Sequence, residues 1–483
     1  MSKFLSAVLT TNLTVLEIMR RQGCLLSLRT WLWFFGFITI QAMPRQRLLR
    51  QPLSLNHDVV TTAVLWIDEV LPETDHDSGS VRAHALVHEI MSQSAHVTIL
   101  PTSQYPRPIS YLSAIALEGA KVIAKIDEAK GTYVGLRYED MARRSWRTPG
   151  QNIECLFSHI VISRRGSYRA TIDDSGDVHR SLVLERCKAA QIIFDTVDLH
   201  FLRNARKKAL AGETLDLMSL ATEEITMSLS STSTWVVSML ERNILSAVLA
   251  RFIDSNPNHR RDASTVPQIE IVSNVVRESQ QLSAFNFEGR ENFVFIGSLN
   301  HAPNVDALHW LLLDIWPTFL QLEMDSELHD STSPPSLLLV GSDWNGNHSI
   351  TNKIFGERKF SKMTNPRTRV KILGHVADLH ALMARSRVSL APLRFGAGVK
   401  GKVCLSAEMG VPLVASKIAM EGTNIPAAVA QTTAKFAEAM LHLYYNKAEW
   451  EKQRGAALEE VRRSYGRERV QRVLSGLFRS VST

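Results

Sequence analysis

Short apolar runs alternate with amphipathic or polar segments along most of this 483-residue chain, and the alternation comes in two series. The runs are rich in Val, Ile and Leu and have the length of buried strands. This pattern predicts an α/β fold with parallel sheets covered by helices on both faces. Strands are expected over residues 59–67, 96–101, 120–126, 156–163, 190–194 and 269–274, then over 293–298, 337–342, 370–374, 388–393 and 413–416, with helices over 81–94, 304–322 and 379–385.

The two series predict two doubly wound domains, because a chain of this length exceeds what one hydrophobic core normally supports. We expect residues 56–285 to form an N-terminal Rossmann-like domain and residues 286–465 to form a C-terminal one. Residues 466–483 are basic and amphipathic and predict a C-terminal helix, and residues 1–55 form an extension with a different composition.

The extension is basic and hydrophobic, with one acid, Glu17, against seven lysines and arginines. Residues 24–43 reach the ~20 residues of a membrane span only by including Arg29. A membrane anchor, an organellar leader and a packing extension all fit this composition. The location stays open between the ER or Golgi membrane, the inner face of another membrane, and the cytoplasm.

The net charge of +7 does not predict a nucleic-acid partner, because much of the excess lies in the extension and no basic run is interleaved with aromatics. The four cysteines, Cys24, Cys155, Cys187 and Cys404, are far apart and form no CxxC pair. Neither a disulfide framework nor a zinc site is predicted, and buried free thiols are expected.

A glycine-rich loop, residues 394–402, follows one expected strand and precedes an expected helix over 403–409. Glycines let backbone N–H groups approach an anion, and the helix N-terminus adds positive partial charge. Two lysines supply full charges, so the loop predicts a phosphate or diphosphate site; a tight turn with two solvated lysines is the alternative. The candidate binding residues are Gly396, Gly398, Val399, Lys400 and Lys402.

Two polar segments follow strands of the first series and should lie at the carboxyl edge of its sheet. Asp77, Ser78, Gly79 and Ser80 precede a helix, and the Asp-x-Asp pattern that ends at Asp77 favours N-capping over metal binding. In the second segment, Asp198 and His200 are candidates to orient an acceptor hydroxyl or act as a base, with a purely structural histidine as the alternative.

Several motifs occur in a fixed order: Asp77–Ser80, Phe194–Arg203, Phe295-Ile296-Gly297-Ser298, Pro303–Asp306, Leu339–Ser342, Leu373–Val376, Ala391–Lys402 and Met420-Glu421-Gly422. In this order they resemble family 4 retaining glycosyltransferases of the GT-B fold, in the branch with a Gly-Val-Lys-Gly-Lys loop. The resemblance covers about residues 57–465.

The resemblance implies a hexosyltransferase-like enzyme that moves a sugar from a nucleotide-diphosphate donor to a glycan, lipid or small-molecule acceptor. Residues 286–465 would bind the donor, with Gly297 and the loop, and residues 56–285 the acceptor. Lys400 and Lys402 would stabilise the departing diphosphate, where losing one donor costs roughly 2.7–4 kcal/mol. Residues 77–80 would face the phosphates or the acceptor. The resemblance implies no cofactor and no catalytic metal, because the nucleotide sugar is a co-substrate.

The chain departs from the family at two glutamate positions, which hold Ala397 and Leu405. Glu408 lies one helical turn after Leu405 and is a candidate ribose ligand, with a surface carboxylate as the alternative. Asn300 and His301 stand near where the family has Arg and Lys. These departures keep open a catalytically silent domain that binds a nucleotide sugar or glycan. A nucleotide-sugar epimerase is less compatible, because it would need the two missing acids.

Overall fold

The computed structural model describes residues 62–73, 78–136, 157–164, 166–167, 187, 189–256, 267–276, 285–326, 334–341 and 368–478. The chain divides into Met1–Ser54 and Leu55–Thr483, and every described residue belongs to the second unit. The predictions for the extension 1–55, including residues 24–43, and for Asp77 therefore lie outside the described residues. Within the part that is described, no helix combines the length and apolarity that a membrane crossing requires.

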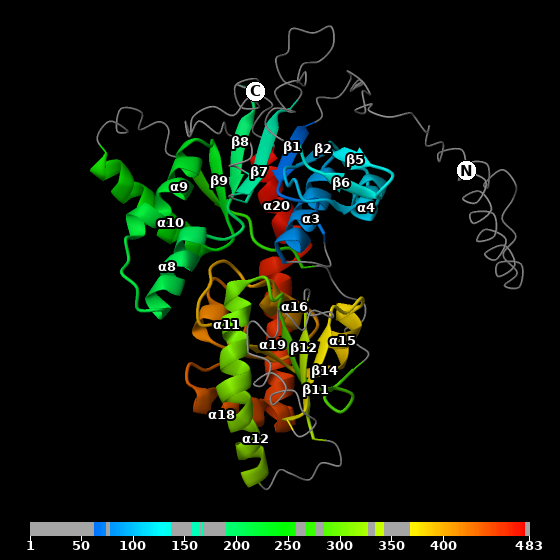
Figure 1. The fold of residues 1–483 in the computed structure, drawn as a ribbon, viewed down its shortest axis with the longest axis vertical. Helices are drawn as coiled ribbons and strands as arrows, with labels where there is room; N and C mark the ends of the chain where they lie inside the picture. Colours follow the sequence, from blue (N-terminus) through cyan, green and yellow to red (C-terminus); the bar gives the residue numbers. More distant parts are fainter. Residues whose placement is uncertain are drawn as a thin grey trace, which may run out of the picture. The chain divides into compact units, whose positions relative to one another are not determined.

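A seven-stranded sheet, in the order β10-β9-β8-β7-β1-β2-β4, forms the first domain (Figure 1). All its neighbouring strands pair in parallel. The strands are β1 (Ala63–Asp68), β2 (His96–Pro101), β4 (Lys121–Val122), β7 (His159–Ser163), β8 (Gln191–Asp195), β9 (Ser233–Val236) and β10 (Gln268–Ile271). The helices are α3 (Ser78–Met91), α4 (Ile109–Leu117), α8 (His200–Leu210), α9 (Leu217–Leu229) and α10 (Met239–Ser255).

The single strand expected over residues 120–126 is two short strands instead. The second of them, β5 (Lys125–Asp127), pairs antiparallel with β6 (Thr132–Val134) in a small sheet completed by β3 (Arg107–Pro108). The chain reverses after Asp127, whose carboxylate accepts a hydrogen bond from the Lys130 N–H at 3.2 Å. The turn brings β6 back alongside β5, so residues 125–127 pair in the small sheet and not in the large one.

A six-stranded parallel sheet, in the order β13-β12-β11-β14-β15-β16, forms the second domain. Its strands are β11 (Glu291–Ile296), β12 (Leu337–Val340), β13 (Val370–Gly374), β14 (Ser386–Ala391), β15 (Leu413–Ala415) and β16 (Ala428–Val429). Its helices are α11 (Ala302–Trp310), η3 (Leu311–Ile315), α12 (Trp316–Asp325), α15 (Leu379–Arg385), α16 (Gly401–Glu408), α17 (Lys417–Met420), α18 (Thr433–Tyr445) and α19 (Lys447–Tyr465).

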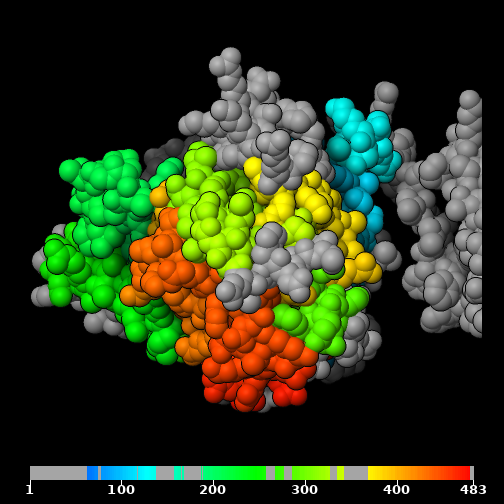
Figure 2. Space-filling view, turned by 90° about the horizontal axis from the view of Figure 1, so that it is seen from below, coloured from blue at the N-terminus to red at the C-terminus, as the bar shows by residue number. Residues whose placement is uncertain are grey.

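The helices of the second domain bury its largest core. Phe293 on β11 contacts Trp316, Phe319 and Tyr444, with ring centroids 4.8–5.7 Å apart. Figure 2 shows α12 in lime beside α18 in orange, and α19 in orange-red next to them. The helix expected over residues 304–322 contains the π-helical turn η3, which the spacing of its apolar residues did not predict.

The C-terminal helix α20 (Arg467–Phe478) forms as expected, but its apolar face packs on the first domain. Val470, Leu474 and Phe478 belong to the same core cluster as residues of β1 and α3, and Figure 1 shows this helix in red beside α3. Arg467 pairs with Glu89 at 2.7 Å and holds the helix there. The exact domain limits remain a prediction.

The two sheets confirm the predicted α/β fold with two Rossmann-like domains. The expectation of free thiols holds for Cys404, which is buried and unpaired. It is wrong for Cys187, which is disulfide-bonded. Spacing along the chain could not show this, because pairing depends on which cysteines the fold brings together.

Candidate functional site

The glycine-rich loop lies at the carboxyl edge of the second sheet. It follows β14, which pairs with β11 and β15, and it leads directly into α16 at Gly401. Gly398 has φ +70°, and a Cβ there would lie 2.9 Å from the Asp198 Cβ. Position 398 therefore requires glycine for two reasons, the positive φ angle and the close approach of the turn after β8.

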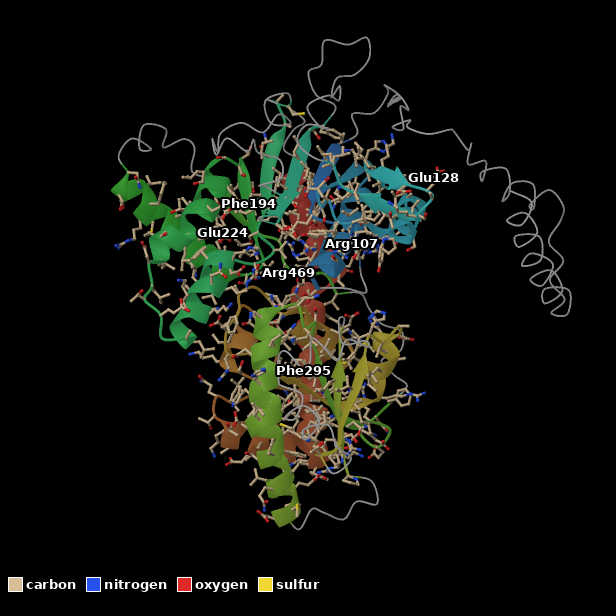
Figure 3. All side chains as sticks on the ribbon, viewed as in Figure 1. Arg107, Glu128, Phe194, Glu224, Phe295 and Arg469 are labelled. Atoms are coloured by element: carbon tan, nitrogen blue, oxygen red, sulfur yellow. The ribbon has the colours of Figure 1, made fainter. Side chains whose placement is uncertain are left out.

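The two loop lysines have poorly solvated ammonium groups. Lys402 Nζ donates to Asn304 Oδ1 at 2.8 Å and lies 4.7 Å from the centroid of the Phe295 ring; Figure 3 labels Phe295 in the second domain. Burial, and secondarily the charge of Lys400, lower the pKa of Lys402 to about 7. Burial lowers the pKa of Lys400 to about 8, although Glu241 and Glu421 partly offset it. An anion between these groups would restore their full charge.

Asn304 positions Lys402 from the start of α11. Its Nδ2 donates to the Ser298 carbonyl at 3.1 Å, so its Oδ1 faces the lysine. A Cβ at Gly297 would lie 2.7 Å from the Asn304 Cγ. Gly297, proposed from sequence as a donor-binding residue, thus allows Asn304 to approach the end of β11.

The start of α3 meets the start of α16. A Cβ at Gly401 would lie 2.4 Å from the Cβ of Ser78, so two helix N-termini come together at the loop. Ser78 is exposed, Gly79 is half-buried, and Ser80 is buried with its Oγ accepting from Arg164 Nη2 at 3.2 Å. Both N-termini carry positive partial charge, which favours an anion.

Asp198 and His200 form a hydrogen-bonded pair beside the loop. His200 Nε2 lies 3.1 Å from Asp198 Oδ1, and Arg203 Nη1 lies 2.6 Å from Asp198 Oδ2. Burial alone would raise the pKa of Asp198, but the hydrogen bond to His200 and the charge of Arg203 outweigh it and lower the pKa to about 2. Asp198 is therefore ionised throughout the neutral range. Glu224 fixes this geometry, because its carboxylate accepts from the His200 N–H at 2.9 Å; Figure 3 labels it.

Three side chains that the sequence analysis did not select hold the loop backbone. Glu241 accepts from the Gly398 N–H at 2.8 Å, Arg206 donates to the Gly396 carbonyl at 2.6 Å, and Asn274 donates to the Val399 carbonyl at 3.4 Å. The sequence does contain one local signal, because Ser238 and Glu241 have capping-box spacing and the Ser238 Oγ accepts from the Glu241 N–H. That signal predicts the start of α10, but not a contact with the loop.

Glu408 lies at the opposite end of α16 from the lysines and is half-buried. The helix has eight residues, so this distance along its axis is about 10 Å. The ribose role of Glu408 remains a prediction. Ala397 is buried, and Leu405 packs partly buried against a core cluster, so neither position offers a polar group to a ligand.

Across the described ranges, no group of three His, Cys, Asp or Glu side chains is arranged to hold a metal ion. The polar groups at the loop edge include two lysines, two helix N-termini, the Asp198–His200 pair and the carboxylate of Glu241. This arrangement suits the binding of an anionic group next to a hydroxyl-bearing group.

Comparison with known proteins gives a family match over part of the chain and the fold of most of it. Residues 290–446, which include β11, the loop and α16, match the family model described as "Glycosyl transferases group 1". No curated protein matches the chain by sequence. Among solved structures, sucrose-phosphate synthase from Thermosynechococcus elongatus has 14% identity and a TM-score of 0.56, with 87% of this chain and 99% of that one covered.

Two further solved structures give the same result. A glycosyltransferase from Rickettsia africae has 11% identity and a TM-score of 0.54, covering 87% of this chain and 98% of its own. Anabaena Alr3699/HepE, in complex with UDP and glucose, has 12% identity and a TM-score of 0.52, covering 87% and 100%. Identities this low show the fold alone. The chain has the GT-B fold of these proteins, and together with the match over residues 290–446 this supports nucleotide-sugar glycosyl transfer.

Proposed function

We propose that the protein is a retaining, family 4-like glycosyltransferase that moves a sugar from a nucleoside-diphosphate donor to an acceptor. The observation that carries the proposal is the pair of poorly solvated lysines, Lys400 and Lys402, at the N-terminus of α16. The start of α3 adds a second helix N-terminus at the same place. A diphosphate supplies the negative charge that this arrangement is built to receive.

In the reaction, the bond between the sugar C1 and the diphosphate oxygen breaks while the acceptor oxygen bonds to C1 from the same face, so the configuration at C1 is retained. Negative charge develops on the departing diphosphate, and Lys400 and Lys402 stabilise it. The Gly398 N–H is already bonded to Glu241, so the backbone donors for the phosphates are those of Gly401 and Lys402 in the first turn of α16. Each such donor is worth roughly 2.7–4 kcal/mol in comparable sites.

On the acceptor side, we assign His200 the role of orienting the acceptor hydroxyl and accepting its proton. Asp198 remains ionised and bonds to His200 Nε2, so it holds the imidazole and stabilises its protonated form. Residues 77–80 are proposed to contact the phosphates or the acceptor. The acceptor class, whether glycan, lipid or small molecule, depends on pocket shape, which residue types alone do not determine.

The test is incubation of the full-length protein with UDP-, GDP-, ADP- and dTDP-sugars and a pool of glycan, lipid and small-molecule acceptors. Release of free nucleotide, together with an acceptor that has gained one sugar of unchanged anomeric configuration by NMR, is the expected result. Saturable binding of a donor with no release would instead assign a silent binding domain. Formation of the epimeric nucleotide sugar would assign an epimerase.

A further inference from the structure

Glu241 joins the two segments that carry the proposed catalytic groups. Its side chain is 2% exposed, and one carboxylate oxygen accepts from both the Gly398 N–H at 2.8 Å and the Leu199 N–H at 3.2 Å. The other oxygen accepts from the Val237 N–H at 3.5 Å. A single buried oxygen therefore bridges the donor loop and the turn after β8.

The positions of the two bridged amides give this contact its significance. Leu199 lies between Asp198 and His200, and Gly398 lies two residues before Lys400. Any change in the bridging oxygen therefore moves the proposed base relative to the cationic groups. A misplacement of about 1 Å between reacting groups can cost a hundredfold in rate.

Arg206 and Asn274 also link the loop to the first domain, but neither bonds the turn after β8 directly. Arg206 bonds the Gly396 carbonyl and pairs with Glu421 at 2.7 Å, and Asn274 bonds the Val399 carbonyl. Arg206 belongs to α8, which begins at His200, whereas Glu241 bonds the Leu199 N–H in the turn itself. The Ser238 cap fixes the first turn of α10 and so holds the backbone of Glu241 in place.

We propose that Glu241 is a positioning residue that sets the distance between the Asp198–His200 pair and the loop that carries Lys400 and Lys402. The role depends on the proposed glycosyl transfer, but the bridge itself does not. Its essential chemical feature is an acceptor oxygen at this point, and a glutamine retains one. Alanine removes both carboxylate oxygens and leaves the buried N–H groups of Gly398, Leu199 and Val237 without this acceptor.

The test compares Glu241→Ala and Glu241→Gln in the full-length protein with Leu249→Ala as a control. Leu249 is a buried residue of the same helix, α10, about two turns away, so its truncation weakens the helix without touching the bridge. Hydrogen exchange is followed in peptides covering residues 196–201 and 395–400, and kcat and KM are measured with the active donor.

Glu241→Ala should accelerate exchange in both peptides and lower kcat by about tenfold to a hundredfold. Glu241→Gln should exchange like the wild type and keep kcat within about threefold, because it retains the acceptor oxygen. Leu249→Ala should lower the melting temperature and leave exchange in the 395–400 peptide unchanged.

The proposal is overturned if Glu241→Ala accelerates exchange in the 196–201 peptide alone, or if Glu241→Gln loses as much activity as Glu241→Ala. Failure of the proposed function looks different. The wild type would then turn over no donor, while the exchange measurements would still report on the bridge.

Discussion

The ammonium of Lys402 donates to the neutral amide oxygen of Asn304 at 2.8 Å, over the face of the Phe295 ring. No ion pair is found for Lys402 among the described residues, and the one charge that shifts its pKa is that of Lys400, another cation. Because Asn304 is neutral, no carboxylate offsets the charge of Lys402 when its ammonium is protonated. A phosphate can therefore bind Lys402 without first displacing a carboxylate.

Asn304→Asp tests this relationship. A carboxylate at this position would pair with Lys402 and neutralise it, so affinity for inorganic pyrophosphate should fall about tenfold or more while the melting temperature holds or rises. Isothermal titration and thermal unfolding measure the two effects. Unchanged pyrophosphate affinity in this variant would show that Lys402 does not contact the anion.

The pH dependence of anion binding follows from the lowered lysine pKa values. Lys402, with a pKa of about 7, is protonated below that pH and neutral above it in the free protein. A bound diphosphate favours the charged form, so above about pH 7 binding must draw in a proton, and affinity should fall by up to about tenfold per pH unit.

Lys402→Arg is the reference for this measurement, because its guanidinium stays protonated at every pH of interest. The ratio of wild-type to Lys402→Arg affinity for pyrophosphate cancels the ionisation of the ligand itself. That ratio should decline between about pH 7 and pH 9. A flat ratio would mean that the pKa of Lys402 is not lowered in the free protein.

Glu408→Gln tests the ribose role predicted from sequence. If Glu408 reaches the ribose, the variant should bind UDP or GDP, whichever the wild type prefers, about tenfold more weakly, because a hydrogen bond to a charged group is worth about 1.5–3 kcal/mol. Pyrophosphate, which has no ribose, should bind as before. Equal nucleotide affinity in variant and wild type would identify Glu408 as a structural carboxylate.

His200→Gln tests the acceptor side. Loss of a general base typically costs about a hundredfold or more in rate, whereas pyrophosphate affinity should stay within about threefold. His88→Gln serves as the matched control, because His88 lies on α3 with a partly exposed side chain outside the proposed site. If His200→Gln and His88→Gln turn over equally fast, His200 is not the base.

Local pattern predicted most of the fold correctly. Helix α15 occupies the predicted residues 379–385, and strand β2 the predicted 96–101. The glycine-rich loop was predicted from its place between strand and helix, and parallel-sheet geometry places it at the carboxyl edge of its own sheet. Asp198 follows β8 of the first sheet, so its approach to Gly398 depends on how the two sheets face each other, which local pattern does not give.

Contacts between residues far apart in the sequence could not be predicted from local pattern. Glu241 has the spacing of a capping-box residue relative to Ser238. Nothing near it in the chain indicates that its carboxylate bonds the Gly398 N–H. The packing of α20 on the first domain and the disulfide of Cys187 are also contacts that local pattern could not predict. Each depends on which surfaces the complete fold brings together, and the sequence pattern of one segment does not contain that information.

The most direct test of the central claim is titration of the full-length protein with inorganic pyrophosphate, comparing wild type, Lys402→Ala and Lys452→Ala. Lys452 is an exposed lysine on α19, so its loss changes the net charge equally without touching the loop. Lys402→Ala should weaken binding about tenfold to a hundredfold, as expected for one charge-assisted hydrogen bond, and Lys452→Ala should bind like the wild type. Equal affinity of Lys402→Ala and wild type would contradict the assignment of this loop as the diphosphate site.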